Sequence, residues 1–458
     1  MTGISRSAAD HVCLLVLCII CGVTGSVHGA DERPDLADAP DAERESIMRF
    51  LTSDAWPHRA IGLLRLERFA CDDSRALIEQ RLADRSWQVR TYAIRALTYR
   101  GAAVPSTLGE NEMHPRVVRT MLRHHVPFDL EKLERGIDRL ARSSAMDDRL
   151  LAVELAAAAQ HPPLENDAIK TLKTVINRMS RTEAGTLSPR LDALTGAGDL
   201  RRDFRWRTWL LKNTRVISLQ PGFAFDKGAP PTELNAIAAL SPDRFTALRD
   251  YMDTLHDRDV ELVVCLDCTA SMGKELSQAQ GELDAMTLFL SDIVRSLRVG
   301  LVAYRDRRDD FETRALDLTN VYSEVRRALW TLSADQGGDS PEAVHPAMKR
   351  AVFEMSWSTD AEKMLVIVGD APPHVGYGEA CINMARNAAR DGNLVTHTVE
   401  AKGKPVKHFK EIARAGGGDC ISLEDQSSLV VELAGLSVTE QYRSQFREFF
   451  RIYLRLCR

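Results

Sequence analysis

The sequence contains no apolar run after residue 30 that is long enough to cross a membrane as a helix. It also lacks a surplus of basic residues, because 60 Lys and Arg face 65 Asp and Glu and the formal net charge is −5. Nothing in this balance indicates a nucleic-acid partner. The 458 residues are 44% hydrophobic and 27% charged. This composition is typical of a soluble globular protein of about two or three domains.

A complete zinc site is missing as well. Cys265 and Cys268 have Cys-x-x-Cys spacing, but no second such pair and no paired histidine accompanies them. They lie within and at the end of a predicted strand, so their side chains should point to opposite faces. We interpret them as small buried residues.

The first 30 residues differ from the rest of the chain. Arg6 precedes an apolar run at 14–23, which is too short to span a bilayer. Val27 and Gly29 then stand three residues and one residue before a cleavage point. The pattern predicts a secretory signal cut near Gly29 or Ala30. The protein should then be exported, to the periplasm, the cell surface or the medium; the alternative is an N-terminal membrane anchor.

Residues 35–215 are predicted to be helical. Four arginines recur at intervals of 31, 29 and 30 residues, at Arg59, Arg90, Arg119 and Arg149. Trp56 and Trp87 share the 31-residue step, and residues 86–97 resemble the second helix of a HEAT repeat. Stacked helix pairs would bury their apolar faces against one another. An ordinary helical bundle is the alternative.

A boundary follows the helical region. Prolines and glycines interrupt residues 216–232, so we interpret 216–257 as a linker with a short helix. From residue 258 onward, apolar strands are predicted at 260–266, 299–304, 364–368, 393–399 and 420–422. Helices are predicted between them, including 286–297, 321–332, 341–356 and 406–415. This alternation predicts an α/β fold with a doubly wound, mostly parallel sheet, which binds ligands at the carboxyl ends of its strands.

Oxygen-bearing side chains follow two of these strands. Asp267, Thr269 and Ser271 come directly after the first strand, and Asp370 follows the strand at 364–368. Between them, Asp339 stands in a glycine turn that opens a helix. Carboxylates and hydroxyls without soft ligands suit Mg²⁺, Ca²⁺ or Mn²⁺.

Four strings in order resemble the von Willebrand factor type A domain over residues 258–435. They lie at 267–272, 303–306, 337–342 and 370–374. A subgroup that includes the domain attached to some alpha-kinases has similar strings, although this chain ends too soon for a kinase domain. The family's metal-ion-dependent adhesion site has the first-loop pattern Asp-x-Ser-x-Ser, which Asp267, Thr269 and Ser271 match with threonine in the middle.

The rest of the adhesion site is matched less fully. Asp370 resembles the third-loop aspartate. The second-loop threonine is not obvious, but Asp339 stands near its place with Ser340 adjacent. Asp306 is interpreted as structural, perhaps paired with an arginine in the fold, and His374 as a loop residue rather than a ligand.

The resemblance implies one divalent cation, Mg²⁺ first, with one coordination position left for an Asp or Glu of a protein partner. The chain would then be a non-enzymatic interaction module with the helical repeats as scaffold. If Asp339 binds directly, its charge should weaken the attraction for an acidic partner. Two alternatives stay open. One is a haloacid dehalogenase-like phosphatase, which needs acids where Thr269 and the residues after Asp370 stand; the other is a structural domain with an empty site.

The C-terminal segment 436–458 is predicted to be an amphipathic helix. Arginines at 443, 447, 451 and 455 form one stripe, and aromatic residues cover much of the remainder. Either this helix packs on the sheet domain, or it lies on anionic lipid.

Export gives the first testable prediction. Mass spectrometry of the mature protein should show an N-terminus near Ala30 or Asp31, because the signal is removed there. An intact Met1 on a cytosolic protein would contradict it.

Overall fold

The computed structural model describes residues 33–69, 72–105, 108, 112, 114–126, 130–159, 162–198, 200, 202–213, 217–220, 234–307, 309–335, 337, 341–423 and 429–457. The expected signal over residues 1–30 lies outside the described residues, as do the proline- and glycine-rich residues 221–232. Asp339 and Ser340 also lie outside them.

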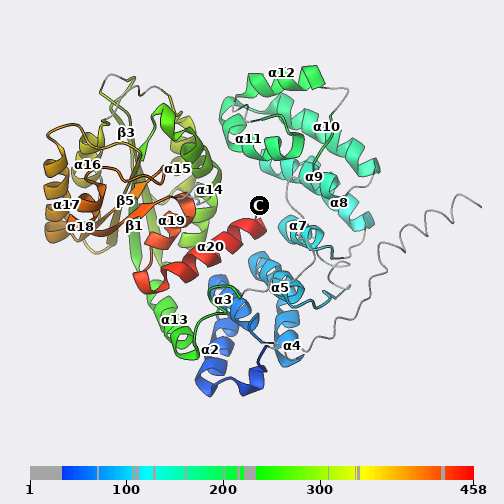
Figure 1. The fold of residues 1–458 in the computed structure, drawn as a ribbon. Helices are drawn as coiled ribbons and strands as arrows, with labels where there is room; N and C mark the ends of the chain where they lie inside the picture. The colour runs from blue at the N-terminus through cyan, green and yellow to red at the C-terminus, as the bar shows by residue number, and fades with distance from the viewer. Residues whose placement is uncertain are drawn as a thin grey trace, which may run out of the picture.

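The N-terminal part is helical, as predicted, and its helices stack into an arc (Figure 1). The helices are α2 (Asp41–Thr52), α3 (Trp56–Leu66), α4 (Asp72–Gln80), α5 (Trp87–Tyr99), α7 (Pro115–Arg123), α8 (Leu130–Ala141), α9 (Met146–Ala159), α10 (Pro162–Arg178), α11 (Arg181–Thr195) and α12 (Asp203–Asn213). Short 3-10 turns occur at η1 (Leu36–Asp38) and η2 (Arg81–Ala83). None of the helices over the described residues combines the length and apolar character needed to cross a membrane.

The C-terminal part is an α/β fold with a doubly wound, mostly parallel sheet, which confirms the predicted fold class. The strands are β1 (Asp259–Asp267), β2 (Ser296–Tyr304), β3 (Thr313–Thr319), β4 (Glu362–Gly369), β5 (Leu394–Glu400) and β6 (Gly417–Ser422). Their order is β3-β2-β1-β4-β5-β6. β3 pairs antiparallel with β2, and the other pairs are parallel. The sequence analysis missed β3, whose side chains are mostly exposed or half-buried at the edge of the sheet.

Helices cover both faces of this sheet. They are α13 (Pro242–Leu255), α14 (Gly273–Ser291), α15 (Tyr322–Thr331), α16 (Val344–Phe353), α17 (Gly378–Gly392), α18 (Phe409–Ala415), α19 (Leu429–Leu436) and α20 (Arg443–Cys457), with 3-10 turns η3 (Ala270–Met272) and η4 (Glu440–Tyr442). The helix expected at 286–297 was misplaced. It begins at Gly273 and ends at Ser291, because Ser296 onward pairs with β1 as β2.

β1 sends alternate side chains into two hydrophobic cores. Val264 and Leu266 pack with α14, α15 and α19, whereas Val263 and Cys265 pack with α16, α17 and α18. Cys268 belongs to the first core and Cys265 to the second, so the two thiols point to opposite faces as expected. Both are buried and free, and burial raises the pKa of the Cys268 thiol to about 12. They form neither a disulfide nor a metal pair.

The recurring arginines have a common role in the helical region. Arg59, Arg90 and Arg149 each donate to the carbonyl oxygen six residues earlier, at 2.8, 2.8 and 2.6 Å. Each guanidinium therefore closes the turn that precedes its own helix. Arg119 differs, because it pairs with Glu154 at 3.7 Å. The shared contact gives the spacing of about 30 residues a physical cause, while the likeness to HEAT repeats stays a prediction.

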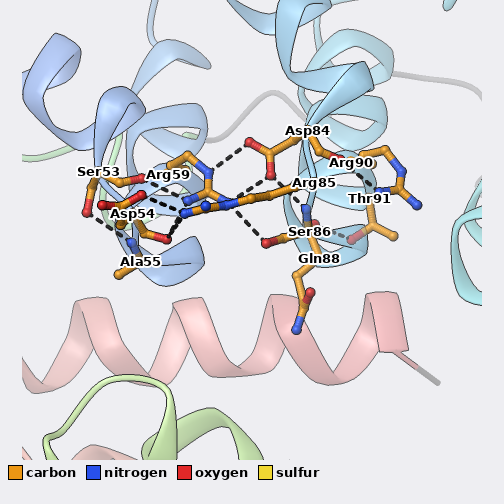
Figure 2. Close-up of polar contacts among 10 residues, drawn as sticks. All are labelled: Ser53, Asp54, Ala55, Arg59, Asp84, Arg85, Ser86, Gln88, Arg90 and Thr91. Atoms are coloured by element: carbon orange, nitrogen blue, oxygen red, sulfur yellow. Dashed lines mark hydrogen bonds and ion pairs between the residues drawn. The ribbon is translucent and has the colours of Figure 1, made fainter.

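Arg59 also links one helix pair to the next. Its Nε and Nη2 bind the two carboxylate oxygens of Asp84, each at 2.8 Å, and Nη2 reaches Ser86 Oγ at 3.0 Å (Figure 2). Both partners of this ion pair are nearly inaccessible to solvent. In the same view, the neighbouring Arg85 reaches Asp54 on the exposed surface.

Residues 234–255 pack on the first helices of the arc. The fully buried Arg65 pairs with Glu43 and donates through Nη1 to the carbonyl oxygens of Ile237, Ala238 and Leu240. α13 then lies against α2. This part of the expected linker is thus held by buried hydrogen bonds, which fix the start of the arc close to the start of β1.

The C-terminal helix α20 lies between the arc and the sheet region (Figure 1). Tyr453 stacks on Trp56 of α3 at 5.5 Å, and Phe449 meets Phe289 of α14 at 4.9 Å, both between ring centroids. Its aromatic side chains are buried at Phe446, Phe449, Phe450 and Tyr453. Three of its arginines pair with Asp419, Glu432 and Glu448. The face that a lipid-bound helix needs is therefore covered by protein, which favours the packed alternative.

The two neighbouring arginines in Figure 2 allow a matched test of the arc. Arg59→Ala leaves the Asp84 carboxylate buried without its partner, so the free energy of unfolding should fall by about 3–5 kcal/mol. Arg85→Ala removes an exposed pair and should cost about 1 kcal/mol or less. Urea unfolding of the two variants measures both. Equal losses would show that the buried contact does not hold the helix pairs together.

Candidate functional site

The carboxyl ends of β1 and β4 meet at one edge of the sheet. β1 ends at Asp267 and β4 at Gly369, and Leu266 pairs with Val368 in the parallel register. Asp370 therefore follows directly beside Asp267, as the sequence predicts. Asp267 is fully buried and Asp370 is half-buried.

The loop after β1 holds its three oxygen-bearing side chains together. The backbone N–H and hydroxyl of Thr269 donate to Asp267 Oδ1 at 2.9 and 2.7 Å. Thr269 Oγ1 and Ser271 Oγ lie 3.2 Å apart. The local sequence produces this cluster, because a carboxylate at the strand end accepts bonds from the residue two positions on. Asp267, Thr269 and Ser271 are thus brought together as predicted.

The second carboxylate oxygen of Asp267 has no hydrogen-bond partner among the described residues, although it is buried. Burial raises the pKa of this carboxyl to about 6 against the opposing effect of the Thr269 hydrogen bonds, and the charge of Asp370 raises it further. A buried carboxylate oxygen without a partner is costly. A cation at this oxygen would offset that cost.

The second loop packs directly on the first. A Cβ at Gly337 would lie 2.7 Å from Thr269 Cβ, and Gly337 has φ +71°, so glycine alone fits here. Gly369 is constrained in the same way, since its Cβ would lie 2.4 Å from the Tyr304 hydroxyl and 3.4 Å from Asp267 Oδ2. The two glycines let the loops approach the carboxylate. Asp339, two residues after Gly337, lies outside the described residues, so its role as a ligand stays a prediction.

Glu342 is a site residue that the sequence analysis did not assign. Its backbone N–H donates to the Pro372 carbonyl oxygen at 3.0 Å, which joins the second loop to the third. Its side chain is 4% exposed, and Oε2 has no partner among the described residues. Burial, and then the charge of Asp267, raise the pKa of this carboxyl to about 9, with further contributions from nearby aspartates. One signal was present in the sequence: the glutamate ends the string that contains Asp339.

Asp306 and His374 form a pair beside the site. His374 Nε2 lies 2.8 Å from Asp306 Oδ1, so Asp306 is paired with a histidine and not with the suggested arginine. The adjacent Arg305 is buried and donates to the carbonyl oxygens of Cys268 and Ser333. These contacts tie the loop after β2 to the loops after β1 and β4, since His374 follows β4.

The donor set of the site is oxygen throughout. Among the residues that the structure describes, no three His, Cys, Asp or Glu side chains form a group able to hold a metal ion. A cation at this edge would therefore also need the Thr269 and Ser271 hydroxyls. A positive charge lies at the rim, where Lys402 donates to the Ser271 carbonyl oxygen and pairs with Glu275 at 3.3 Å.

No family model and no curated protein matches the chain. Three solved structures resemble part of it. The conserved hypothetical protein BatB from Bacteroides thetaiotaomicron shares 16% identity, with 43% of this chain and 98% of that chain covered and a TM-score of 0.29. An aerotolerance-related membrane protein from Bacteroides fragilis shares 17% over 37% and 94%, also at 0.29. The SpRpn10 VWA domain shares 11% over 38% and 94%, at 0.31. These likenesses carry no argument about function, which rests on the residues described above.

The crowding of carboxylates predicts an effect of Glu342 in the metal-free protein. In chelator, Glu342→Gln should raise the melting temperature by a few degrees, because it removes one buried carboxylate from beside Asp267. The exposed Glu354, on α16, provides the control, and Glu354→Gln should leave the melting temperature unchanged. A Glu342→Gln protein that melts below the wild type would show that the carboxylate is stabilising without a cation.

Proposed function

We propose that the chain is a non-enzymatic interaction module that binds a protein partner through one divalent cation at the carboxyl edge of its sheet. The observation that carries this proposal is the buried Asp267 oxygen without a partner, surrounded by further oxygen donors. Export, and the likeness to the von Willebrand factor type A domain, are parts of the same proposal.

The residues at this edge fit a hard cation. Asp267, Thr269, Ser271 and Asp370 would hold it through oxygens, directly or through water, with Asp339 and Glu342 as the second-loop donors. Carboxylates and hydroxyls are the ligands that Mg²⁺, Ca²⁺ and Mn²⁺ take in proteins. When bound, the cation supplies an electrophilic centre for an oxygen of the partner. The absence of nitrogen and sulfur donors argues against zinc.

The second loop sets the charge of the site and thereby the kind of partner. Asp267 and Asp370 balance a divalent cation, and the hydroxyls are neutral. A third carboxylate, from Asp339 or Glu342, gives the loaded site a negative charge and weakens its attraction for an acidic partner. We propose an acidic side chain as the partner's ligand when the second loop contributes no charge to the cation.

Catalysis of the phosphatase type is the less supported alternative. It needs a carboxylate two residues after Asp267 to act as general acid, and Thr269 stands there. Thr269 instead spends its hydroxyl proton on Asp267. A phosphatase assay on the purified protein separates the two functions.

The metal site gives a direct prediction. A hundredfold excess of cation over its dissociation constant stabilises the fold by about 2.7 kcal/mol. For a domain of this size, the melting temperature should rise by about 5–10 °C. Asp267→Ala should stay folded and lose most of this shift, because one carboxylate fewer also means less repulsion. Thermal melts and calorimetry with Mg²⁺, Mn²⁺ and Ca²⁺ measure it.

Asp259 is the matched control, because it begins the same strand and pairs with Arg295 at the opposite edge of the sheet. Asp259→Ala should keep the full metal-dependent shift. Asp339→Ala tests the second-loop ligand separately. If none of the three cations moves the wild-type melting temperature at millimolar concentration, the structural domain with an empty site replaces the proposed function.

A further inference from the structure

The last helix of the arc, α12, has two faces of opposite packing but similar chemistry. Trp206 and Leu210 on its inner face are buried against α10 and α11. On its outer face, Phe204 is 53% exposed and Leu211 is 80% exposed. The terminal unit of a helical stack normally presents a polar outer face to water. The outer face of α12 therefore carries apolar side chains that the fold of this chain does not cover.

The two exposed side chains form a line on a projecting helix. Phe204 and Leu211 are seven residues apart, so they lie on one stripe of the helix, about 10 Å apart along its axis. Figure 1 shows α12 at the outer end of the helical region, beyond α10 and α11. Such a ridge suits a flat partner better than a peptide that needs a groove.

A positive field surrounds this stripe. Arg207 donates to the Met179 carbonyl oxygen at 2.8 Å, which brings the junction of α10 and α11 beside α12. Over residues 178–183 and 202–213 the basic residues outnumber the acidic ones by six to two; the basic ones are Arg178, Arg181, Arg202, Arg205, Arg207 and Lys212. All six are exposed. The two acids are already engaged, since Asp203 pairs with Arg207 and Glu183 caps α11. In a chain of net charge −5, this local excess selects an anionic partner.

We propose that the outer face of α12 docks on an anionic phospholipid surface. Phe204 and Leu211 enter the interfacial layer, and the surrounding guanidinium and ammonium groups contact the headgroup phosphates. Apolar tips flanked by Lys and Arg are the features that hold a helix in this layer. The site is separate from the carboxyl edge of the sheet and does not depend on a cation there.

The test is flotation of the full chain with phosphatidylcholine vesicles and with vesicles that also contain phosphatidylglycerol. The wild type should bind the anionic vesicles more strongly, and high salt should remove the preference. The Phe204→Ser/Leu211→Ser variant should lose roughly tenfold in binding to the anionic vesicles. Arg205→Glu/Lys212→Glu should lose roughly tenfold or more, because it removes two attractive charges and adds two repulsive ones.

Two controls separate this surface from the rest of the chain. Val321→Ser/Phe353→Ser removes two exposed apolar side chains from the sheet region and should bind like the wild type. The neutral vesicles report binding through the apolar N-terminal run, which all variants share. Equal binding of the α12 and control variants overturns the proposal. It is also overturned if the wild type shows no preference for anionic vesicles, in which case the surface suits an acidic protein instead. Metal-dependent melting should be unchanged in all variants, so its loss would concern the proposed function alone.

Discussion

β1 lies between β2 and β4, and both neighbours run parallel to it. This alignment places the loops after these three strands at one edge, and it buries β1 on both faces. The strand therefore consists of apolar side chains that alternate between two cores and ends abruptly in a carboxylate. Asp267 is held at the boundary between a dry interior and the surface, and the loops around it are arranged to contact it.

The cost of that position explains several features of the edge together. Thr269 satisfies one oxygen of Asp267 twice, and Gly337 and Gly369 allow the neighbouring loops to close over it. Glu342 adds a second buried carboxylate instead of a counter-charge. Carboxylates gathered in a buried place repel one another unless protons or cations neutralise them. The proposed cation resolves this crowding with the donors that are already there.

The helical arc braces the sheet region at both of its ends. Near its start, Arg65 and α13 fix the chain before β1, and α20 fills the space between α3 and α14 with aromatic rings. Near its end, α11 contacts α14 and α15. The inner side of the arc is thus occupied by the chain itself, which supports its role as scaffold. The outer ridge of α12 is left for contacts with other surfaces.

The sequence by itself determined the elements whose causes are local. Parallel strands covered on both faces are continuous apolar runs, so β1, β2, β4, β5 and β6 could be recognised, and Asp267, Thr269 and Ser271 are neighbours in one loop. Asp370 followed from the rule that carboxyl ends of parallel strands share an edge.

Only the tertiary structure decided what depends on distant segments. β3 is a half-exposed edge strand without an apolar run, and its pairing with β2 defines it. Glu342 became a site residue because Pro372 and its neighbours bury it, and Asp306 found His374 across two loops. The arginine stripe of α20 suggested lipid until the fold buried its aromatic face. In each case the free energy comes from contacts between residues far apart in the chain, and no local pattern encodes which residues will meet.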